Sequence, residues 1–209
     1  MKSRHASSLS TEASSGPAAR GQGEIRIIGG VWKRTRLTVP VRPGLRPTPD
    51  RVRETLFNWL GQSLGGWRCV DVFAGTGALG LEAASRGAAE VVLCEQDRAL
   101  VQQLKTHVTR LQATHVNVHA GDGLHWLRQQ TGGHWDVVFL DPPYASDLFE
   151  PALRAAASAI GPQGWVYLEA PEAWDAQTLS TLGWSLQRHL KAGAVHAHLL
   201  QLESVRGAA

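Results

Sequence analysis

The chain has 209 residues, of which 43% are hydrophobic and 19% are charged, and it carries a net charge of +3. These values are typical of one globular domain with a small additional segment, and no run approaches the ~20 consecutive apolar residues that a membrane span needs. The two cysteines, Cys69 and Cys94, lie within apolar runs, so we expect buried free thiols rather than a disulfide. A globular, cytoplasmic protein is therefore expected.

Residues 1–23 are rich in Ser, Ala and Gly, and they lack the apolar segment of a signal peptide. Such a composition cannot bury enough apolar surface to offset the entropy of ordering the chain. We predict a disordered leader with no role in the fold.

A strongly basic segment follows this leader. From residue 26 to residue 53, eight Lys and Arg side chains are opposed by one acid, Asp50, so this segment carries +7 and the rest of the chain −4. Charge separated in this way favours a nucleic-acid face over an ordinary solvated surface. Beside Trp32, Lys33 and Arg34 fit either a grip on single-stranded RNA or a solvated hairpin tip. The predicted RNA contacts are Arg26, Lys33, Arg34, Arg46, Arg51 and Arg53.

The same segment predicts a small β unit and a helix. Residues 25–28 and 36–39 are β-prone, and Thr48 followed by Pro49 predicts a helix start with a hydroxyl cap. Apolar residues at 52, 56, 59 and 60 recur at helical spacing, which leaves Arg51 and Arg53 pointing off the packed face. Residues 24–64 are thus predicted to form a basic, RNA-facing N-terminal extension of hairpin and helix.

From residue 68 the pattern becomes an alternation of strands and helices. The predicted strands are residues 69–73, 91–94, 116–118, 136–140 and 165–168, and the predicted helices are residues 78–86, 98–111, 124–129 and 148–160. Short apolar strands between helices predict a parallel sheet covered on both faces. Residues 184–190 and 195–202 are joined too closely for a crossover helix, so they predict an antiparallel hairpin. The expected fold class is α/β, with a Rossmann-like, mostly parallel sheet closed by this hairpin.

A glycine-rich loop connects the first strand of this sheet to its helix. Gly75, Gly77 and Gly80 allow a tight turn and a close approach of a ligand to the backbone. With Glu95 placed 20 residues after Gly75, these glycines also fit the dinucleotide-binding fingerprint. A nicotinamide-dependent dehydrogenase is therefore one interpretation of the loop.

Three acids at the ends of three successive strands favour another ligand. Asp71 can attract the ammonium or sulfonium of S-adenosylmethionine, Glu95 can accept both ribose hydroxyls, and Asp122 can accept from the adenine amine. Asp122 is explained equally well as a helix cap. As a set, the acids fit a nucleoside with a cationic tail. The predicted cofactor contacts are Asp71, Phe73, Ala74, Gly75, Thr76, Gly77, Glu95, Gln96, Asp122 and Gly123.

The motif Asp141-Pro142-Pro143-Tyr144 follows the fourth strand and supplies the predicted catalytic residues. Its prolines remove two N–H donors and leave carbonyl and carboxylate acceptors, which suit a planar amine. Asp141 and the Pro142 carbonyl are expected to accept the two N–H bonds of an aryl amine, and Asp141 to take the surplus proton. Tyr144 is expected to stack on the base. A Pro-Pro turn with a core tyrosine is the purely structural alternative.

This motif is similar to that of methyltransferases that act on exocyclic amines of bases. Together with residues 25–30, 45–48, 50–60 and 71–83, it makes residues 24–204 resemble the RsmD family. The resemblance implies a seven-stranded, S-adenosylmethionine-dependent methyltransferase domain over residues 65–205. It also implies that the methyl acceptor is N2 of a guanine in 16S ribosomal RNA, within an assembling small subunit. The family's glycine loop, ribose acid, adenine-side acid and catalytic motif correspond to Gly75 and Gly77, Glu95, Asp122, and residues 141–144.

Guanine rather than adenine as the acceptor follows from the resemblance alone. An N6-adenine methyltransferase acting on DNA or RNA, and a non-catalytic RNA-binding assembly factor, are the alternatives. The nine histidines show no spacing typical of a zinc site, so no metal is expected. No apolar patch is evident, and a monomer is the default expectation.

Overall fold

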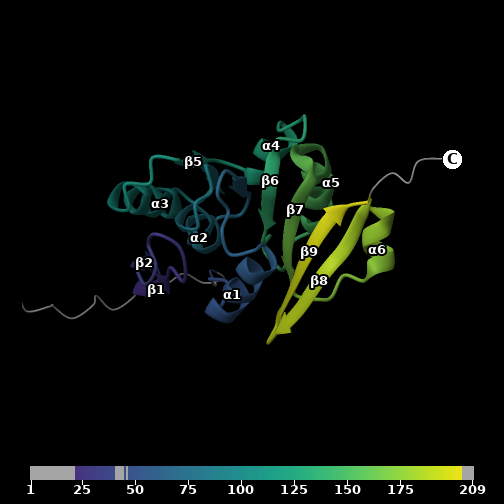
Figure 1. Ribbon diagram of the computed structural model, residues 1–209, viewed down its shortest axis with the longest axis horizontal. Coiled ribbons are helices and arrows are strands. Elements are labelled where there is room, and N and C mark those ends of the chain that lie inside the picture. Colours follow the sequence, from purple (N-terminus) through teal and green to yellow (C-terminus); the bar gives the residue numbers. More distant parts are fainter. Residues whose placement is uncertain (1–21, 41–44, 46, 204–209) are drawn as a thin grey trace, which may run out of the picture.

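The computed structural model of the protein describes residues 22–40, 45 and 47–203. Its main feature is a seven-stranded sheet with the strand order β5-β4-β3-β6-β7-β9-β8 (Figure 1). The strands are β3 Arg68–Asp71, β4 Glu90–Glu95, β5 Val116–Ala120, β6 Trp135–Leu140, β7 Ile160–Ala170, β8 Trp184–Ala192 and β9 Val195–Leu202. Neighbouring strands from β5 to β7 are parallel, whereas β9 pairs antiparallel with both β7 and β8. The predicted mostly parallel sheet with a closing hairpin is confirmed.

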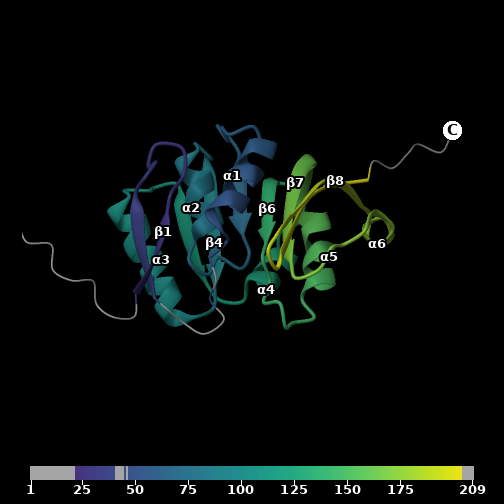
Figure 2. The ribbon, with the colours of Figure 1, turned by 90° about the horizontal axis from the view of Figure 1, so that it is seen from below.

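Helices cover both faces of the sheet, because successive side chains of each strand point to opposite sides. Leu93 and Phe139 pack on the face covered by α1 (Asp50–Trp59), α2 (Ala78–Ser85) and α3 (Arg98–Arg110). Val92 and Val138 pack on the other face, which is covered by α4 (Gly123–Arg128), α5 (Phe149–Ala159) and α6 (Ala176–Thr181). Figure 2 shows the two helical layers on either side of the strands.

The N-terminal extension forms an antiparallel pair, β1 (Gln22–Arg26) and β2 (Arg36–Pro40), which lies alongside α3 (Figure 2). The side chains of Gln103 and His107 both donate to the Thr38 carbonyl, at 2.9 and 3.0 Å. Apolar residues of this pair and of α1 belong to the same core as the adjacent face of the large sheet. The extension is therefore packed as part of the domain.

Three local predictions need correction or lie partly outside the described residues, and one helix was not predicted. Helix α1 begins at Asp50 with Pro49 in the cap position and no side-chain cap, so the predicted Thr48 cap is wrong. Helix α6 was not predicted, and β7 extends well beyond residues 165–168. Residues 1–21 of the predicted leader lie outside the described residues, while 22 and 23 belong to β1.

Cys69 and Cys94 are buried free thiols, as expected. None of the helices in the described part of the chain is long and apolar enough to cross a membrane.

Candidate active site

The predicted catalytic and cofactor residues meet at the carboxyl ends of the parallel strands. The chain runs from β3 outward to β4 and β5, and then returns to place β6 on the other side of β3. Such a reversal opens a crevice at the carboxyl edge, where open α/β sheets bind ligands. Asp71 ends β3 and Asp141 directly follows β6, so the two carboxylates flank this crevice.

The glycine loop has the backbone conformation that its sequence predicts. Gly75 and Gly77 have φ angles of 51° and 79°, in the left-handed region that glycine favours. Gly77 immediately precedes α2, and a Cβ there would lie 2.6 Å from Leu104 Cδ2. The Ala74 N–H donates to the Cys94 carbonyl at 2.9 Å, which fixes the loop against β4. Phe73 and Thr76 lie in the same loop, and Thr76 is buried.

Glu95 ties the end of β4 to this loop. Its carboxylate accepts from the Gly75 N–H and from the Asp97 N–H, both at 2.8 Å. The next residue, Gln96, is exposed. The structure thus places the predicted ribose acid against the predicted glycine loop.

Asp122 caps α4 by accepting from the His125 N–H at 3.0 Å, so its interpretation as a helix cap is confirmed. This bond uses one oxygen of the exposed Asp122 carboxylate, so the other oxygen can still accept a hydrogen bond from a ligand. At Gly123, an added Cβ would overlap the Val72 carbonyl oxygen. Only glycine therefore lets α4 start this close to the end of β3.

The catalytic motif presents an aromatic ring at the surface beside buried acids. Pro142 is buried, whereas Tyr144 is 36% exposed. The Tyr144 hydroxyl donates to Glu169 at 3.4 Å, and the Tyr167 hydroxyl donates to the same carboxylate at 3.0 Å. Sequence reasoning missed Glu169. Its position at the carboxyl end of β7, like that of Asp71 on β3, is the signal that was overlooked.

The acids of the crevice hold their protons more tightly than ordinary carboxyls. Burial raises the pKa of Asp71 to about 7, with the charges of Glu95 and Glu169 acting in the same direction and hydrogen bonds from the backbone opposing it. Burial also raises the pKa of Asp141 well above its usual range, and the charges of Glu169 and Asp71 add to this effect. Such mutual perturbation is typical of functional sites, because a bound cation can then be stabilised strongly.

The prediction that Arg53 points off the packed face is wrong. Its side chain is buried, and its guanidinium contacts Glu82 at 3.2 Å and Asp50 at 2.6 Å. An arginine at this position of α1 reaches α2 because the N-terminal extension packs directly onto that helix. Arg53 is therefore a structural residue, unavailable to RNA phosphate.

The other predicted RNA contacts are dispersed. The Lys33–Arg34 turn lies beside Ser85, the last residue of α2, because the Trp32 N–H donates to the Ser85 hydroxyl at 2.9 Å. Since α2 starts at the glycine loop, this turn lies at the opposite end of the sheet from Asp141. The Trp32 ring stacks on His115, with centroids 5.9 Å apart, and packs against the core.

Arg26 pairs with Asp50 at 3.0 Å on the surface, and Arg51 is exposed on α1. The predicted contact by Arg46 lies outside the described residues. The positive charge of this face is also smaller than the count over residues 26–53 suggests, because Glu24 and Glu82, which lie outside that segment, pair with Arg36 and Arg53.

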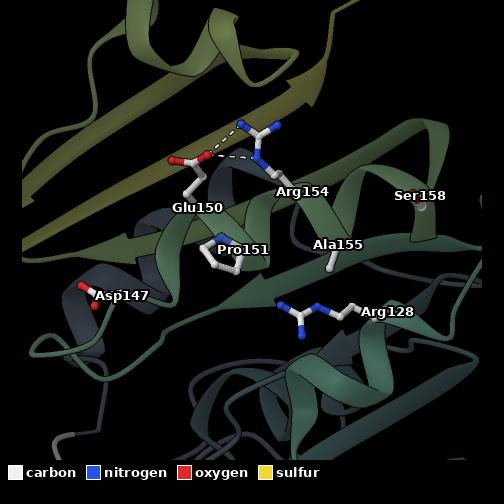
Figure 3. A pocket seen from close by; sticks show the side chains of 7 residues that line it. All are labelled: Arg128, Asp147, Glu150, Pro151, Arg154, Ala155 and Ser158. Carbon is white, nitrogen blue, oxygen red and sulfur yellow. Dashed lines mark hydrogen bonds and ion pairs between the residues drawn. The ribbon is translucent and has the colours of Figure 1, made fainter.

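A separate hollow of about 650 Å³ lies between α4 and α5 and contains none of the predicted site residues (Figure 3). Two of the charged residues that line this hollow already pair with each other, because Arg154 donates twice to Glu150, at 2.7 and 2.9 Å. Figure 3 shows this pair on α5 and Arg128 on the neighbouring helix. Among the described residues, no group of three or more His, Cys, Asp or Glu side chains is arranged to hold a metal.

Comparison with known proteins gives consistent matches over nearly the whole chain. The family described as conserved hypothetical protein 95 matches residues 25–201. The chain is 42% identical, over 90% of its length and 95% of the relative's, to ribosomal RNA small subunit methyltransferase D of Escherichia coli K12. It is 38% identical to the protein of that name from Haemophilus influenzae, over 86% of this chain and 95% of the relative.

Solved structures agree with these sequence matches. A putative methyltransferase from Escherichia coli superimposes with a TM-score of 0.74 and 39% identity, covering 87% of this chain and 99% of the other. A putative methylase from Haemophilus influenzae gives 0.72 and 35%, covering 87% and 100%. The similarity therefore includes both the sheet and the N-terminal extension.

Proposed function

The chain belongs to the RsmD family, and on this premise we propose that it transfers a methyl group from S-adenosylmethionine to the N2 amine of a guanine in 16S ribosomal RNA. We propose that the RNA is methylated within an assembling small ribosomal subunit. The observation that carries it is the exposed Tyr144 ring three residues after the half-buried Asp141, at the end of the sheet where the glycine loop lies. The names of the relatives support small-subunit ribosomal RNA as the substrate class.

The residues of the crevice fit S-adenosylmethionine. Asp71 is a buried carboxyl whose pKa is raised to about 7, so a nearby cation favours its ionised form. Glu95 holds the glycine loop, which supports its proposed role as the acceptor of the ribose hydroxyls, and exposed Asp122 lies at the start of α4. When bound, the cofactor supplies an electrophilic methyl group.

This chain's own residues prepare the amine. An aryl amine is a weak nucleophile, because its lone pair is delocalised into the ring. We propose that Asp141 and the Pro142 carbonyl accept the two N–H bonds of the amine, that Tyr144 stacks on the base, and that Asp141 takes the surplus proton. Pro142 and Pro143 fix the backbone around these acceptors and contribute no competing N–H donors.

Among the basic residues, Arg51 is the described side chain best placed to contact phosphate near the site. It is exposed on the first turn of α1, three residues after Thr48, whose side chain lies close to Glu169 in the crevice. Lys33 and Arg34 fit a more distant part of a large RNA, at the other end of the sheet. Arg26 is partly neutralised by Asp50, so its contribution is smaller.

The deciding experiment is transfer of labelled methyl groups to small ribosomal subunits that lack the modification, followed by nucleoside analysis. Label in N2-methylguanosine supports the proposal, whereas label in N6-methyladenosine retains the chemistry and replaces the acceptor. Parallel reactions with free 16S RNA and with duplex DNA separate the particle substrate from its alternatives. Cofactor binding without transfer to any of these acceptors would contradict the proposed reaction and favour a binding role in assembly.

A further inference from the structure

Two tyrosines are present in the chain, and both donate to one carboxylate. The Tyr144 hydroxyl lies 3.4 Å from Glu169 Oε1, and the Tyr167 hydroxyl lies 3.0 Å from Oε2. The side chain of Thr48 is buried close to the same group, where it helps to lower the pKa of Glu169. Glu169 is 4% exposed, and a carboxylate buried to this extent requires such partners.

The two tyrosine donors and the neighbouring Thr48 come from three parts of the molecule. Tyr144 belongs to the catalytic motif, Tyr167 to β7, and Thr48 to the N-terminal extension just before α1. Leu140 pairs with Leu168 in the parallel register of β6 and β7. The next residue of each chain segment, Asp141 after β6 and Glu169 within β7, therefore lies at the same level of the sheet. Glu169 therefore joins the extension to the catalytic loop at the edge of the crevice.

We infer that Glu169 is a positioning residue of the active site, which orients the Tyr144 ring and fastens the Thr48 segment beside it. An exposed tyrosine on a loop samples several orientations unless its hydroxyl is held, and stacking on a base needs one of them. The role rests on the proposed function, whereas the contacts themselves do not. Neither the glycine loop nor Asp141 is needed to make these contacts.

Glu169 also acts on the charge of its neighbour. Burial raises its pKa, while hydrogen bonds from Tyr167, Thr48 and Tyr144 oppose that effect. The charge that these hydroxyls stabilise on Glu169 raises the pKa of Asp141 in turn. Replacing Glu169 by glutamine removes the charge, so the acid limb of the rate–pH profile is expected to move to lower pH.

The contacts can be tested without any substrate. Protein labelled with ¹³C in the tyrosine rings gives signals from Tyr144 and Tyr167 alone. In Glu169→Gln both sets of signals are expected to shift, because each hydroxyl loses its charged acceptor. The matched control is Glu90→Gln, which removes the same charge from an exposed residue at the opposite end of the sheet and is expected to leave both sets unchanged.

The positioning role is tested by kinetics on the same variants. Glu169→Gln is expected to lower kcat about tenfold, the effect of one hydrogen bond to a charged group, with little change in KM for RNA or in affinity for S-adenosylhomocysteine. Tyr144→Phe, a change at a partly exposed residue that leaves the core intact, is expected to give a smaller loss. Because both changes break the same contact, the two losses should not multiply in the double variant.

Several results would overturn the inference. Unshifted tyrosine signals in Glu169→Gln would show that the contacts do not form. A wild-type kcat in that variant would show that the contacts do not position the Tyr144 ring for catalysis. Multiplicative losses in the double variant, or a changed KM alone, would also contradict it. A different outcome separates the two proposals: the wild-type protein methylates no acceptor, yet the tyrosine signals shift in Glu169→Gln as expected. In that case the proposed function and the positioning role are both wrong, whereas the contacts of Glu169 are confirmed.

Discussion

The guanidinium of Arg53 lies 3.2 Å from the carboxylate of Glu82, and the two side chains are 2% and 0% exposed. Glu82 also accepts from the Ile28 N–H at 2.8 Å, the Gly29 N–H at 2.7 Å and the Arg86 guanidinium at 2.8 Å. One carboxylate on α2 thus holds the chain after β1, helix α1 and the end of its own helix. The N-terminal extension is fastened to the domain through this residue.

Glu82→Gln is expected to lower the free energy of unfolding by about 3–5 kcal/mol, because it removes the buried carboxylate that Arg53 and Arg86 share and leaves the buried Arg53 guanidinium with Asp50 alone. Urea denaturation followed by tryptophan fluorescence measures the change. Glu54→Gln, on the exposed face of α1, is the control and should alter stability by no more than about 0.5 kcal/mol. Equal urea midpoints for Glu82→Gln and wild type would show that this network does not anchor the extension.

Asp141→Asn is expected to reduce kcat about 10²–10⁴-fold, the range typical of a lost general base, while S-adenosylhomocysteine binding is retained. The asparagine keeps the shape of the side chain but cannot take the proton of the amine. Isothermal titration and single-turnover methyl transfer measure the two properties separately. Asp147→Asn, an exposed change in the loop that follows the motif, should leave both as in wild type. A variant at position 141 with full turnover would contradict the proposed chemistry.

Much of the fold and the core of the site could be predicted because they depend on local patterns. Alternating apolar strands and helices indicated the parallel sheet, and a glycine loop followed by an acid indicated where Glu95 contacts Gly75. Strand ends in a parallel sheet converge, so acids far apart in the chain could be placed in one crevice. The element bounds differ from those predicted by a few residues at most in β3 to α5.

The errors arose where partners are distant in sequence. Arg53 looked solvent-facing from helical periodicity, since nothing local shows that Glu82 reaches it from α2. Thr48 looked like a helix cap, yet its side chain is buried close to Glu169, which comes more than a hundred residues later. Charge counting overestimated the basic face for the same reason, because it cannot see which charges are paired.

Asp71→Asn is expected to stabilise the protein at pH 8 and to have little effect at pH 4. The pKa of Asp71 is raised from 3.8 to about 7 in the folded protein, so folding holds the proton that the unfolded chain releases. Its contribution therefore becomes increasingly unfavourable as the pH rises from about 4 to about 7, and the total is at most about 4 kcal/mol at 1.4 kcal/mol per pKa unit. Unfolding by urea at both pH values tests this.

The same variant is expected to bind S-adenosylmethionine more weakly, because a cation loses its carboxylate. A variant that is no more stable at pH 8 would show that Asp71 is ionised in the folded protein at little cost. Unchanged affinity would exclude it from the binding of the cationic tail.

Gly123→Ala is expected to destabilise the protein by about 1–3 kcal/mol, the usual effect of overpacking, and to weaken cofactor binding. An added Cβ would overlap the Val72 carbonyl oxygen, which forces the start of α4 away from the end of β3. Asp122 caps that helix and would move with it. Gly65→Ala is the control, since its Cβ would lie 3.8 Å from the nearest side-chain atom. Equal stability and affinity for both variants would show that α4 can shift freely.

His198 is expected to make the protein less stable as the pH falls from about 6.5 to about 4. Its Nε2 accepts from the Trp174 N–H at 3.0 Å, so its Nδ1 carries the proton and donates to the Leu168 carbonyl at 3.2 Å. Burial, more than the nearby His189 and His196, lowers the pKa of this ring to about 4. The folded protein therefore keeps the ring neutral while the unfolded chain takes up a proton.

Over this range the group is expected to contribute a loss of at most about 3.5 kcal/mol, at 1.4 kcal/mol for each pKa unit. Urea denaturation of wild type at pH 7, 6, 5 and 4 gives the slope, and His198→Gln should lower it because glutamine does not titrate. His134→Gln removes an exposed histidine and should retain the wild-type slope. If the slope of His198→Gln equals that of wild type, the ring must be protonated in the folded protein as readily as in the unfolded chain, and the hydrogen bond from Trp174 cannot be maintained at low pH.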